Sequence, residues 1–357
     1  MSMDQVAQDL DEEADACAQM AADGYADLLR RAAADIRAGG PCGTLLKEYA
    51  DTPTTGVLPL RLLGGVHALV LAGRAPELAR YYPSAGGTCR PGDEDARWAA
   101  FRAVVDAESA TLRGWLRRPP QTNEVGRASL LIAGLLHAVT ELGDLPVRLV
   151  ELGASAGLNL RADRFRVESP GFAWGPVDSP VRLPDAWRGA PPDWLRAAGA
   201  AYPELTVVER LGCDPRPLDP TDPDGALTLR AYVWPEHTER AARLAGALEV
   251  AGQVPATVVT AGAADFLAGI RPTPGTLTVV WHSVVQQYVP AQEWARVDAE
   301  LERLAGAEAP VAYLAYEPYP DRDPTRSPRC RLLARLGDGP TRRLAEGHPH
   351  GLPAWLP

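Results

Sequence analysis

The sequence predicts an all-α domain over residues 1–142, followed by an α/β domain over 143–357 that is built on a mostly parallel sheet. Two observations indicate this division. Before residue 142, apolar residues recur every three to four positions, as they do on one face of an amphipathic helix. After Pro146, short apolar runs alternate with helical stretches, which is typical of parallel strands joined by crossover helices.

Five stretches of the first part carry the helical spacing, and Gly and Pro residues interrupt them. They cover residues 5–20, 24–39, 58–72, 93–117 and 124–142.

The second part contains six short apolar runs of strand type and two clear helical stretches. The strands are expected at 147–150, 206–208, 227–233, 257–260, 277–281 and 311–316, and the helices at 236–251 and 291–305. Residues 161–205 are rich in Pro, Gly and Trp without periodicity, so we expect an insertion there. Residues 330–336 and 341–345 flank a glycine-containing turn and predict an antiparallel hairpin at the end of the sheet.

Composition and charge narrow the classes of partner. The chain has 357 residues, of which 46% are hydrophobic, so it can fill a sizeable core. Its net charge of -10 gives no overall attraction to nucleic acid or to anionic membranes. The first residues lack the pattern of a secretory signal, and no apolar run reaches about 18 residues, so we expect a cytoplasmic protein with a small-molecule partner.

The cysteines indicate neither a disulfide framework nor a metal site. Five of them are scattered along the chain without a Cys-x-x-Cys pair or a Cys/His cluster. We expect reduced thiols and no metal at Cys17, Cys42, Cys89, Cys213 and Cys330.

The most informative motif is the loop Glu151-Leu-Gly-Ala-Ser-Ala-Gly157, which follows the first expected strand. Gly153 and Gly157 allow a ligand to approach the backbone closely, and the next helix is expected to present free N–H groups. An acid before the first glycine repels a pyrophosphate and attracts the cationic amino-acid end of S-adenosyl-L-methionine. The loop therefore predicts an adenosylmethionine site, with contacts from Glu151, Gly153, Ser155, Gly157 and Asn159; the simpler interpretation is a turn whose small residues only permit packing.

Further acids follow later strands of the expected sheet. Asp214 and Glu236 each follow an apolar run, and either could accept hydrogen bonds from the ribose hydroxyls. Asp265 follows the run at 257–260 and is expected at the adenine amino group, with Phe266 beside the ring. Each of these acids could instead be a turn acid or a helix cap.

Polar residues also follow the strand expected at 277–281. His282 and Ser283 lie where an open α/β sheet binds ligands, at the carboxyl ends of its strands, and Tyr288 comes soon after. We expect Ser283 to contact the cofactor, and His282, Tyr288 and Glu317 to be catalytic. The alternative for His282 is a histidine satisfied at a domain seam.

The segment Gln121-Thr-Asn-Glu-Val-Gly-Arg127 precedes the helix that leads into the first strand, so it could fold over the cofactor site. Its polar groups suit a polar substrate. The expected substrate contacts are Gln121, Asn123, Glu124 and Arg127; the simpler interpretation is a helix start capped by Asn123.

Residues 151–160, Asp265, the polar end at His282 and the C-terminal hairpin together resemble the class I methyltransferase fold over about residues 147–357. A longer set of motifs, Tyr81-Tyr-Pro-Ser-Ala-Gly-Gly87, Gln121 to Arg127, residues 151–160, Val233-Trp-Pro-Glu236 and His282-Ser283, is similar to DUF2332, a bacterial family of unknown function. The resemblance implies an adenosylmethionine-dependent methyltransferase-like domain behind a helical domain. It does not supply a substrate.

These observations predict methyl transfer to a small polar molecule, with N-methylation of an amine or guanidine preferred because Glu317 could orient a cationic group. Three alternatives stay open. Gly153-Ala-Ser-Ala-Gly157 also fits the nucleophile elbow of an α/β-hydrolase, with Ser155, Asp265 and either His282 or His348 as the triad, although a helical domain and not several strands precedes it. A protein that binds adenosylmethionine without catalysis is the second. A nicotinamide-dependent dehydrogenase is the third, and both Glu151 and the missing middle glycine disfavour it.

Overall fold

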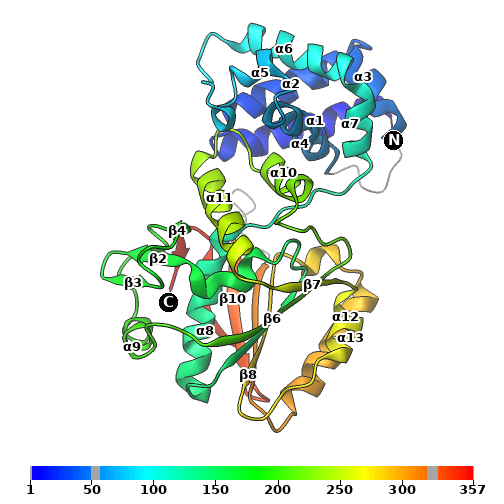
Figure 1. Cartoon of the computed structure of the whole chain (residues 1–357). Coiled ribbons are helices and arrows are strands. Elements are labelled where there is room, and N and C mark those ends of the chain that lie inside the picture. The colour runs from blue at the N-terminus through cyan, green and yellow to red at the C-terminus, as the bar shows by residue number, and fades with distance from the viewer. Residues whose placement is uncertain (1, 50–56, 320–328, 357) are drawn as a thin grey trace. The chain divides into compact units, whose positions relative to one another are not determined.

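The computed structural model describes residues 2–49, 57–319 and 329–356. The chain divides into two compact units, one made of Met1–Thr122 with Asp222–Ala241 and one made of Asn123–Thr221 with Ala242–Pro357. The first unit is helical and the second is α/β (Figure 1). The predicted fold class is confirmed: a helical N-terminal region precedes an α/β domain whose mostly parallel sheet ends in antiparallel strands.

The helical unit is held together by a hydrophobic core to which most of its helices contribute. Leu10, Leu29, Leu62, Phe101 and Leu112 are all completely or almost completely buried in it. In the described part of residues 1–122, the helices are α1 (Met3–Gln19), α2 (Asp23–Arg37), α3 (Pro41–Leu46), η1 (Lys47–Tyr49), α4 (Leu58–Leu71), α5 (Pro76–Ala79), η3 (Pro83–Ala85), α6 (Glu94–Ala107) and α7 (Ser109–Leu116).

A later segment completes this unit and corrects one sequence prediction. The expected strand at 227–233 is part of a helix, α10 (Pro223–Ala231), and is followed by α11 (Thr238–Gln253). Asp222 caps α10 by accepting the N–H of Gly225 at 3.0 Å, and Pro223 occupies its first turn. The alternation of Leu227 and Leu229 resembles a strand, but this capped start selects the helix.

The α/β unit contains the remaining elements. Its strands are β1 (Val147–Leu152), β2 (Arg166–Ser169), β3 (Phe172–Trp174), β4 (Arg182–Leu183), β5 (Trp187–Arg188), β6 (Val207–Asp214), β7 (Thr257–Thr260), β8 (Leu277–Ser283), β9 (Val311–Pro318), β10 (Cys330–Leu336), β11 (Arg342–Gly347) and β12 (Ala354–Trp355). Its helices are η4 (Val125–Arg127), α8 (Ala128–Leu142), η5 (Leu158–Arg164), α9 (Asp193–Ala201), α12 (Ala263–Gly269), η6 (Gln286–Tyr288) and α13 (Ala291–Ala305).

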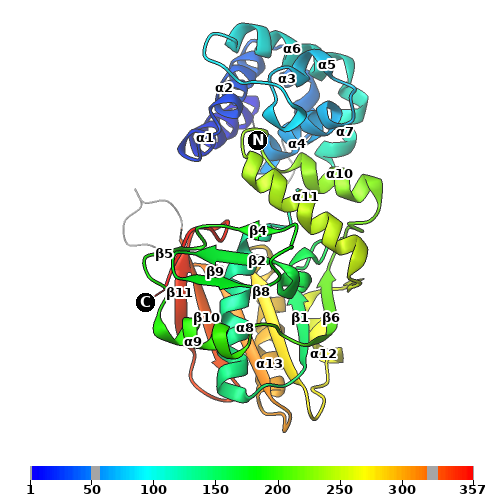
Figure 2. The ribbon, with the colours of Figure 1, turned by 60° about the vertical axis from the view of Figure 1, so that its left-hand side comes forward.

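The large sheet has the strand order β5-β12-β11-β10-β9-β8-β1-β6-β7, with β10 and β11 forming the predicted hairpin beside β9 (Figure 2). The five parallel strands run in the order third, second, first, fourth, fifth along the chain. Such an order reverses direction between the first and fourth parallel strands, here β1 and β8. Open α/β sheets bind ligands outside the carboxyl ends of their strands at this switch point.

The two faces of the sheet are covered by different helices (Figure 1). His282 of β8 contacts Trp294 of α13, whereas a Cβ at Gly134 of α8 would lie 2.7 Å from Leu314 of β9. Residues in register on neighbouring strands point to the same face of a sheet. The face toward α13 therefore carries Leu152, His282 and Ala315. The face toward α8 carries Glu151, Trp281 and Leu314.

Helix α8 is a core element of the α/β unit. The stretch Val125–Leu142 has the length and apolar composition of a membrane span, but 78% of it is buried within the structure. It packs on β8, β9 and β10, so it belongs with the sheet and not with the helical part to which its periodicity assigned it.

Two further element boundaries differ from the sequence prediction. The helix expected at 93–117 is broken at Glu108 into α6 and α7. Strand β6 continues to Asp214 past two charged residues, because Glu209 pairs with Arg148 and Arg210 pairs with the buried Asp163. Between β1 and β6, the expected insertion forms a small three-stranded sheet and α9.

Candidate functional site

The candidate site lies at the switch point, where the loop after β1 and the turn after β8 meet. Gly153, Ser155 and Gly157 all have positive φ angles, of 66°, 53° and 67°. Only glycine adopts this conformation without strain, so the spacing of the two glycines reflects the path of the loop. Leu152 and His282, the neighbours of the two loops, are directly in register.

Most backbone N–H groups of the loop are already hydrogen-bonded within the protein. The amide of Ala154 donates to Cys213 O, that of Ser155 to Asp214 Oδ2, and that of Gly157 to Ala154 O. The amide of Leu158, the first residue of η5, donates to Asn123 Oδ1 at 2.8 Å. The expectation of free N–H groups at the next helix is therefore corrected: the segment after the loop is a short, kinked 3-10 helix whose first amide is occupied.

Glu151 provides a buried carboxyl group at the end of β1. The residue is only 3% exposed, and its Oε2 atom is buried without a hydrogen-bond partner. Trp281 is in register with it on β8, and its indole Nε1 is buried without a hydrogen-bond partner. Burial raises the pKa of Glu151 to about 8, although Trp281, Arg127 and Arg161 act in the opposite direction. Two polar groups without partners thus face the α8 side of the sheet.

The segment before α8 packs against this loop. Besides the contact of Asn123 with Leu158, the Asn159 side chain donates to Glu124 O at 3.2 Å. Asn159 Oδ1 is buried and has no partner. The structure therefore brings Asn123 and Glu124 of this segment to Asn159 and the glycine loop, as the sequence hypothesis of a fold-over segment requires. Glu124, not Asn123, caps the helix start by accepting the N–H of Gly126.

Arg127 links three parts of the α/β unit. Its guanidinium donates to Ser283 O at 3.0 Å and to Pro349 O at 2.8 Å. These bonds tie η4 to the end of β8 and to the C-terminal loop. Gln121 belongs to the helical unit.

The C-terminal loop adds a residue that the sequence did not single out. His350 Nδ1 lies 3.1 Å from Glu124 Oε2, and the rings of His348 and His350 are in contact. Gly126 permits this arrangement, because a Cβ there would lie 2.4 Å from His350 O. Sequence reasoning missed three residues that contact or pair with the predicted site residues: His350, Trp281 and Tyr313. For Trp281, the only signal in the sequence was its position next to His282 in a buried strand.

The two ribose candidates occupy different parts of the molecule. Asp214 ends β6 beside the glycine loop, where Oδ2 accepts the N–H of Ser155 and Oδ1 that of Arg216. Glu236 is not at the end of a strand, which corrects the premise of its assignment. It lies between α10 and α11 in the helical unit and accepts the N–H of Tyr25 at 3.1 Å.

The two adenine candidates lie on α12. Asp265 forms an ion pair with Arg296 of α13, and its side chain is 70% exposed. Phe266 packs half-buried against the core between the sheet, α12 and α13. The structure does not bring either residue to Glu151, and their role at an adenine ring stays a prediction.

His282 and Glu317 lie on the other face of the sheet from Glu151. His282 Nδ1 is 2.6 Å from Glu317 Oε1, and Nε2 is 2.6 Å from the Tyr313 hydroxyl. Because both ring nitrogens are engaged, neither is available to accept a proton from a substrate in this arrangement. Ser283 uses its carbonyl to accept from Arg127, and the Tyr288 side chain is exposed beyond the turn.

Two of the residues proposed for the hydrolase triad, Asp265 and His282, have partners other than Ser155. Ser155 has the positive φ angle of a nucleophile elbow, but the proposed acid Asp265 pairs with Arg296 on α12 and α13. The proposed base His282 is held by Glu317 and Tyr313. His348 is in ring contact with His350.

The described part of the chain contains no group of three or more His, Cys, Asp or Glu residues that could hold a metal ion. All five cysteines are free thiols, and four of them are buried. Burial raises the pKa of the Cys213 thiol to about 12.

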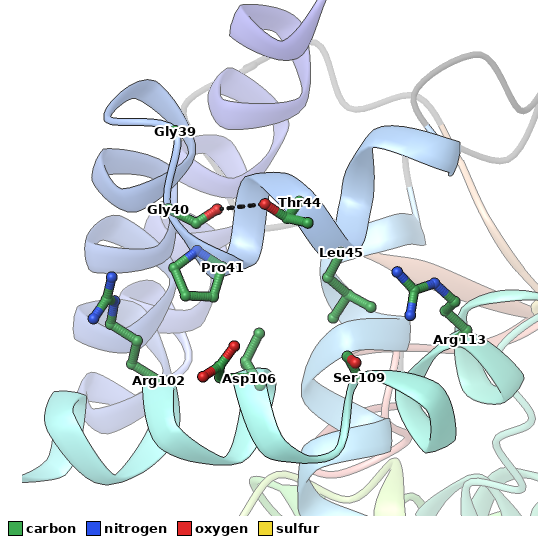
Figure 3. Close-up of a pocket in the computed structure, with 10 residues that line it drawn as sticks. Gly39, Gly40, Pro41, Thr44, Leu45, Arg102, Asp106, Ser109 and Arg113 are labelled. Atoms are coloured by element: carbon green, nitrogen blue, oxygen red, sulfur yellow. Dashed lines mark hydrogen bonds between the residues drawn. The ribbon is translucent and has the colours of Figure 1, made fainter.

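A separate open cleft lies in the helical unit, between α3 and the α6–α7 corner (Figure 3). Its volume is about 340 Å³. The charges at its two ends are already paired, since Arg102 binds Asp35 at 3.0 Å and Arg113 lies 3.5 Å from Glu48. The cleft therefore offers no unpaired cation that would select an anionic ligand.

Comparison with known proteins identifies the family and no relative of known function. No curated protein and no solved structure matches the chain. A family model described as "Uncharacterized protein conserved in bacteria (DUF2332)" matches residues 7–355. The match includes the helical unit, the glycine loop and the C-terminal hairpin, and so the chain belongs to the DUF2332 family.

Proposed function

We propose that the α/β unit binds S-adenosyl-L-methionine and transfers its methyl group to a small polar molecule. The observation that carries this proposal is the buried carboxyl group of Glu151 at the switch point of the sheet, whose Oε2 atom has no hydrogen-bond partner. A buried polar atom without a partner costs free energy, so a protein that keeps one commonly uses it. A cationic ligand would satisfy it.

The glycine loop supports the same choice of ligand class. A dinucleotide phosphate needs free backbone N–H groups, but those of Ala154, Ser155, Gly157 and Leu158 have partners inside the protein. Two buried side-chain acceptors of residues 151–159, Glu151 Oε2 and Asn159 Oδ1, have no hydrogen-bond partner. This loop is therefore better suited to a cation than to a pyrophosphate.

The residues present fit adenosylmethionine in three places. Glu151 would hold its cationic amino-acid end, the loop from Gly153 to Gly157 would pass close to it, and Asp214 would accept from the ribose. Each Asp214 oxygen accepts one backbone N–H and keeps a further acceptor site. When bound, adenosylmethionine would supply a sulfonium methyl group, whose carbon a nucleophile attacks in line so that adenosylhomocysteine is the leaving group.

An amine or guanidine is the acceptor that we favour. As the acceptor nitrogen gains the methyl group it must lose one proton, and adenosylhomocysteine leaves. The pair of Glu124 and His350 offers a proton acceptor next to the glycine loop, since Glu124 O contacts Asn159. His282 and Glu317 cannot take this task directly, because they extend from the opposite face.

The proposal is tested by calorimetric titration of the full chain with adenosylmethionine, adenosylhomocysteine and NAD in parallel. We expect both sulfur compounds to bind and to raise the melting temperature, because the site exists only in the folded state. Binding of NAD alone would overturn the proposal. Binding of adenosylmethionine without methyl transfer to any of a panel of small amines and guanidines would instead identify a non-catalytic binding protein.

The variant Glu151→Gln removes the charge and keeps the shape of the side chain. Losing a hydrogen bond to a buried charged group costs about 1.5–3 kcal/mol, so the dissociation constant for adenosylhomocysteine should rise about 10- to 150-fold. Asp193→Asn, which changes an exposed acid on α9, is the matched control and should bind as the wild type does. Equal affinity of both variants would remove Glu151 from the site.

A further inference from the structure

A buried chain of hydrogen bonds runs along the α13 face of the sheet. Tyr313, His282 and Glu317 are joined by two contacts of 2.6 Å, and the His282 side chain is 1% exposed. Trp294 packs edge-on against the imidazole at 5.1 Å. The ring is therefore fixed in position as well as in hydrogen bonding.

The direction of these bonds follows from the neighbours of Glu317. Its Oε1 atom accepts the N–H of Val285 at 2.9 Å, so it is an acceptor toward His282 as well. The proton must then be on His282 Nδ1, which leaves Nε2 to accept from the Tyr313 hydroxyl. Glu317 thus sets the tautomer, and Tyr313 is the terminal donor of the relay formed by Tyr313, His282 and Glu317.

The relay ends on a strained turn. Val284 has a φ of +53°, which is unfavourable for a β-branched residue and persists only where the surroundings impose it. Its N–H donates to Tyr316 O, and the next two amides, of Val285 and Gln286, both point to Glu317 Oε1. These bonds impose the turn.

The turn at residues 284–286 packs on the glycine loop. A Cβ at Gly153 would lie 2.5 Å from Val285 Cγ2, so the Val285 side chain covers the first glycine of the loop. On this side, Val285 occupies the space next to Gly153. A group on one side of the sheet is thereby connected to the loop at the end of β1.

We propose that Tyr313 is a positioning residue for the glycine loop: through His282 and Glu317 it holds Val285 against Gly153, and so determines which ligands can approach that loop. Tyr313 touches no ligand in this role. The control of ligand approach rests on the proposed function of the α/β unit. The holding of Val285 against Gly153 does not depend on that function.

The first test is amide hydrogen exchange on the full chain without ligand. In Tyr313→Phe, exchange over 153–157 and 284–286 should accelerate about tenfold or more relative to the wild type, while the strands keep their protection. Tyr319→Phe is the matched control, because its hydroxyl bonds Glu346 at 3.0 Å near the hairpin. If exchange in the two loops is the same in both variants, the inference is wrong.

Two further variants separate the relay from general loosening. Val285→Ala keeps both relay contacts and the bond from the Val285 N–H to Glu317, and it should accelerate exchange at 153–157 only. His282→Asn keeps a donor for Glu317 but loses Tyr313, so adding Tyr313→Phe to it should cause little further change. Additive effects of the two substitutions would show independent structural roles and overturn the relay.

The ligand arm uses adenosylhomocysteine as the probe. Tyr313→Phe should weaken its binding about tenfold without a comparable loss in Tyr319→Phe. If the wild-type protein binds no adenosylhomocysteine, the proposed function fails and the exchange measurement still decides the role of Tyr313. If the wild type binds and Tyr313→Phe binds equally well, the relay does not control ligand approach.

Discussion

At the scale of single residues, burying the carboxyl group of Glu151 lowers the free energy of unfolding when that group is ionised. The proposed role in binding a cation gives a reason for this cost. Folding moves its carboxyl group from water to a site that is 3% exposed, where burial raises the pKa from 4.5 to about 8. The folded state therefore binds more protons than the unfolded state between these two pH values. The contribution of Glu151 to the free energy of unfolding is therefore greatest below pH 4.5, where the carboxyl group is protonated in both states. It falls as the pH rises from 4.5 to about 8.

Glu151→Gln should remove this dependence. Near pH 5 the variant and the wild type should unfold at similar temperatures, whereas at pH 9 the variant should be more stable by several kcal/mol, since one pKa unit corresponds to about 1.4 kcal/mol. Thermal unfolding monitored from pH 5 to 9 measures the difference between the two proteins. A wild type that is the more stable of the two at pH 9 contradicts the raised pKa of the buried Glu151 carboxyl group.

The same residue predicts a proton release on binding. At pH 6.5 most of the Glu151 carboxyl in the free protein is protonated, and a bound cation favours the ionised form. Binding of adenosylmethionine should then release close to one proton, and Glu151→Gln should release none. Calorimetry in two buffers of different ionisation enthalpy measures this number, and an equal release from both proteins would place the cation elsewhere.

The sequence could indicate Glu151 because a carboxyl between a strand and a glycine loop is a local pattern. It could not indicate Tyr313 or His350, because their partners lie 31 and 226 positions away in the chain. Whether His282 faces Glu151 or α13 depends on the register and the alternation of β1 and β8. That alternation placed His282 and Glu317 on the face opposite Glu151.

At the scale of elements, buried ion pairs replace the apolar residues expected of a core strand. Arg210 of β6 binds Asp163 of η5 through two contacts of 2.5 and 2.7 Å and also donates to Leu160 O. These bonds hold the kinked 3-10 segment that follows the glycine loop. The sequence predicted too short a strand here, because charged residues interrupt the apolar run. The sequence gives no sign that Arg210 is neutralised by a residue of another element.

Asp163→Asn should therefore destabilise the α/β unit strongly. Removing one partner of a buried pair leaves the other charge uncompensated and costs about 3–5 kcal/mol. The exposed pair of Arg196 and Asp193 provides the control, since Asp193→Asn should change the free energy of unfolding by less than about 1 kcal/mol. Urea unfolding measures both. Similar small losses would mean that water reaches Asp163 in solution.

At the scale of the whole molecule, a segment from the second half of the chain completes the helical unit. Gly64 of α4 allows close packing of Tyr232, because a Cβ there would lie 2.6 Å from the tyrosine ring. His67 bonds Ala231 O at 3.0 Å, and Trp234 contacts Tyr25. Helical periodicity could locate the helices of residues 1–122, but it carries no information about this return of the chain.

Residues 1–122 alone should consequently fail to form a rigid fold. The groups that receive α10 would be exposed: Gly64, His67 and the Tyr25 amide, which Glu236 accepts at 3.1 Å. A second fragment, in which a flexible linker of about 15 Gly and Ser residues joins 122 to 222–241, should regain near-ultraviolet circular dichroism and a cooperative thermal transition. The same linked fragment with Glu236→Ala should melt at a lower temperature, because the N–H groups at the start of α2 lose their acceptor. A cooperative transition of residues 1–122 alone, at the temperature of the linked fragment, would show that the returning segment only covers a unit that is already complete.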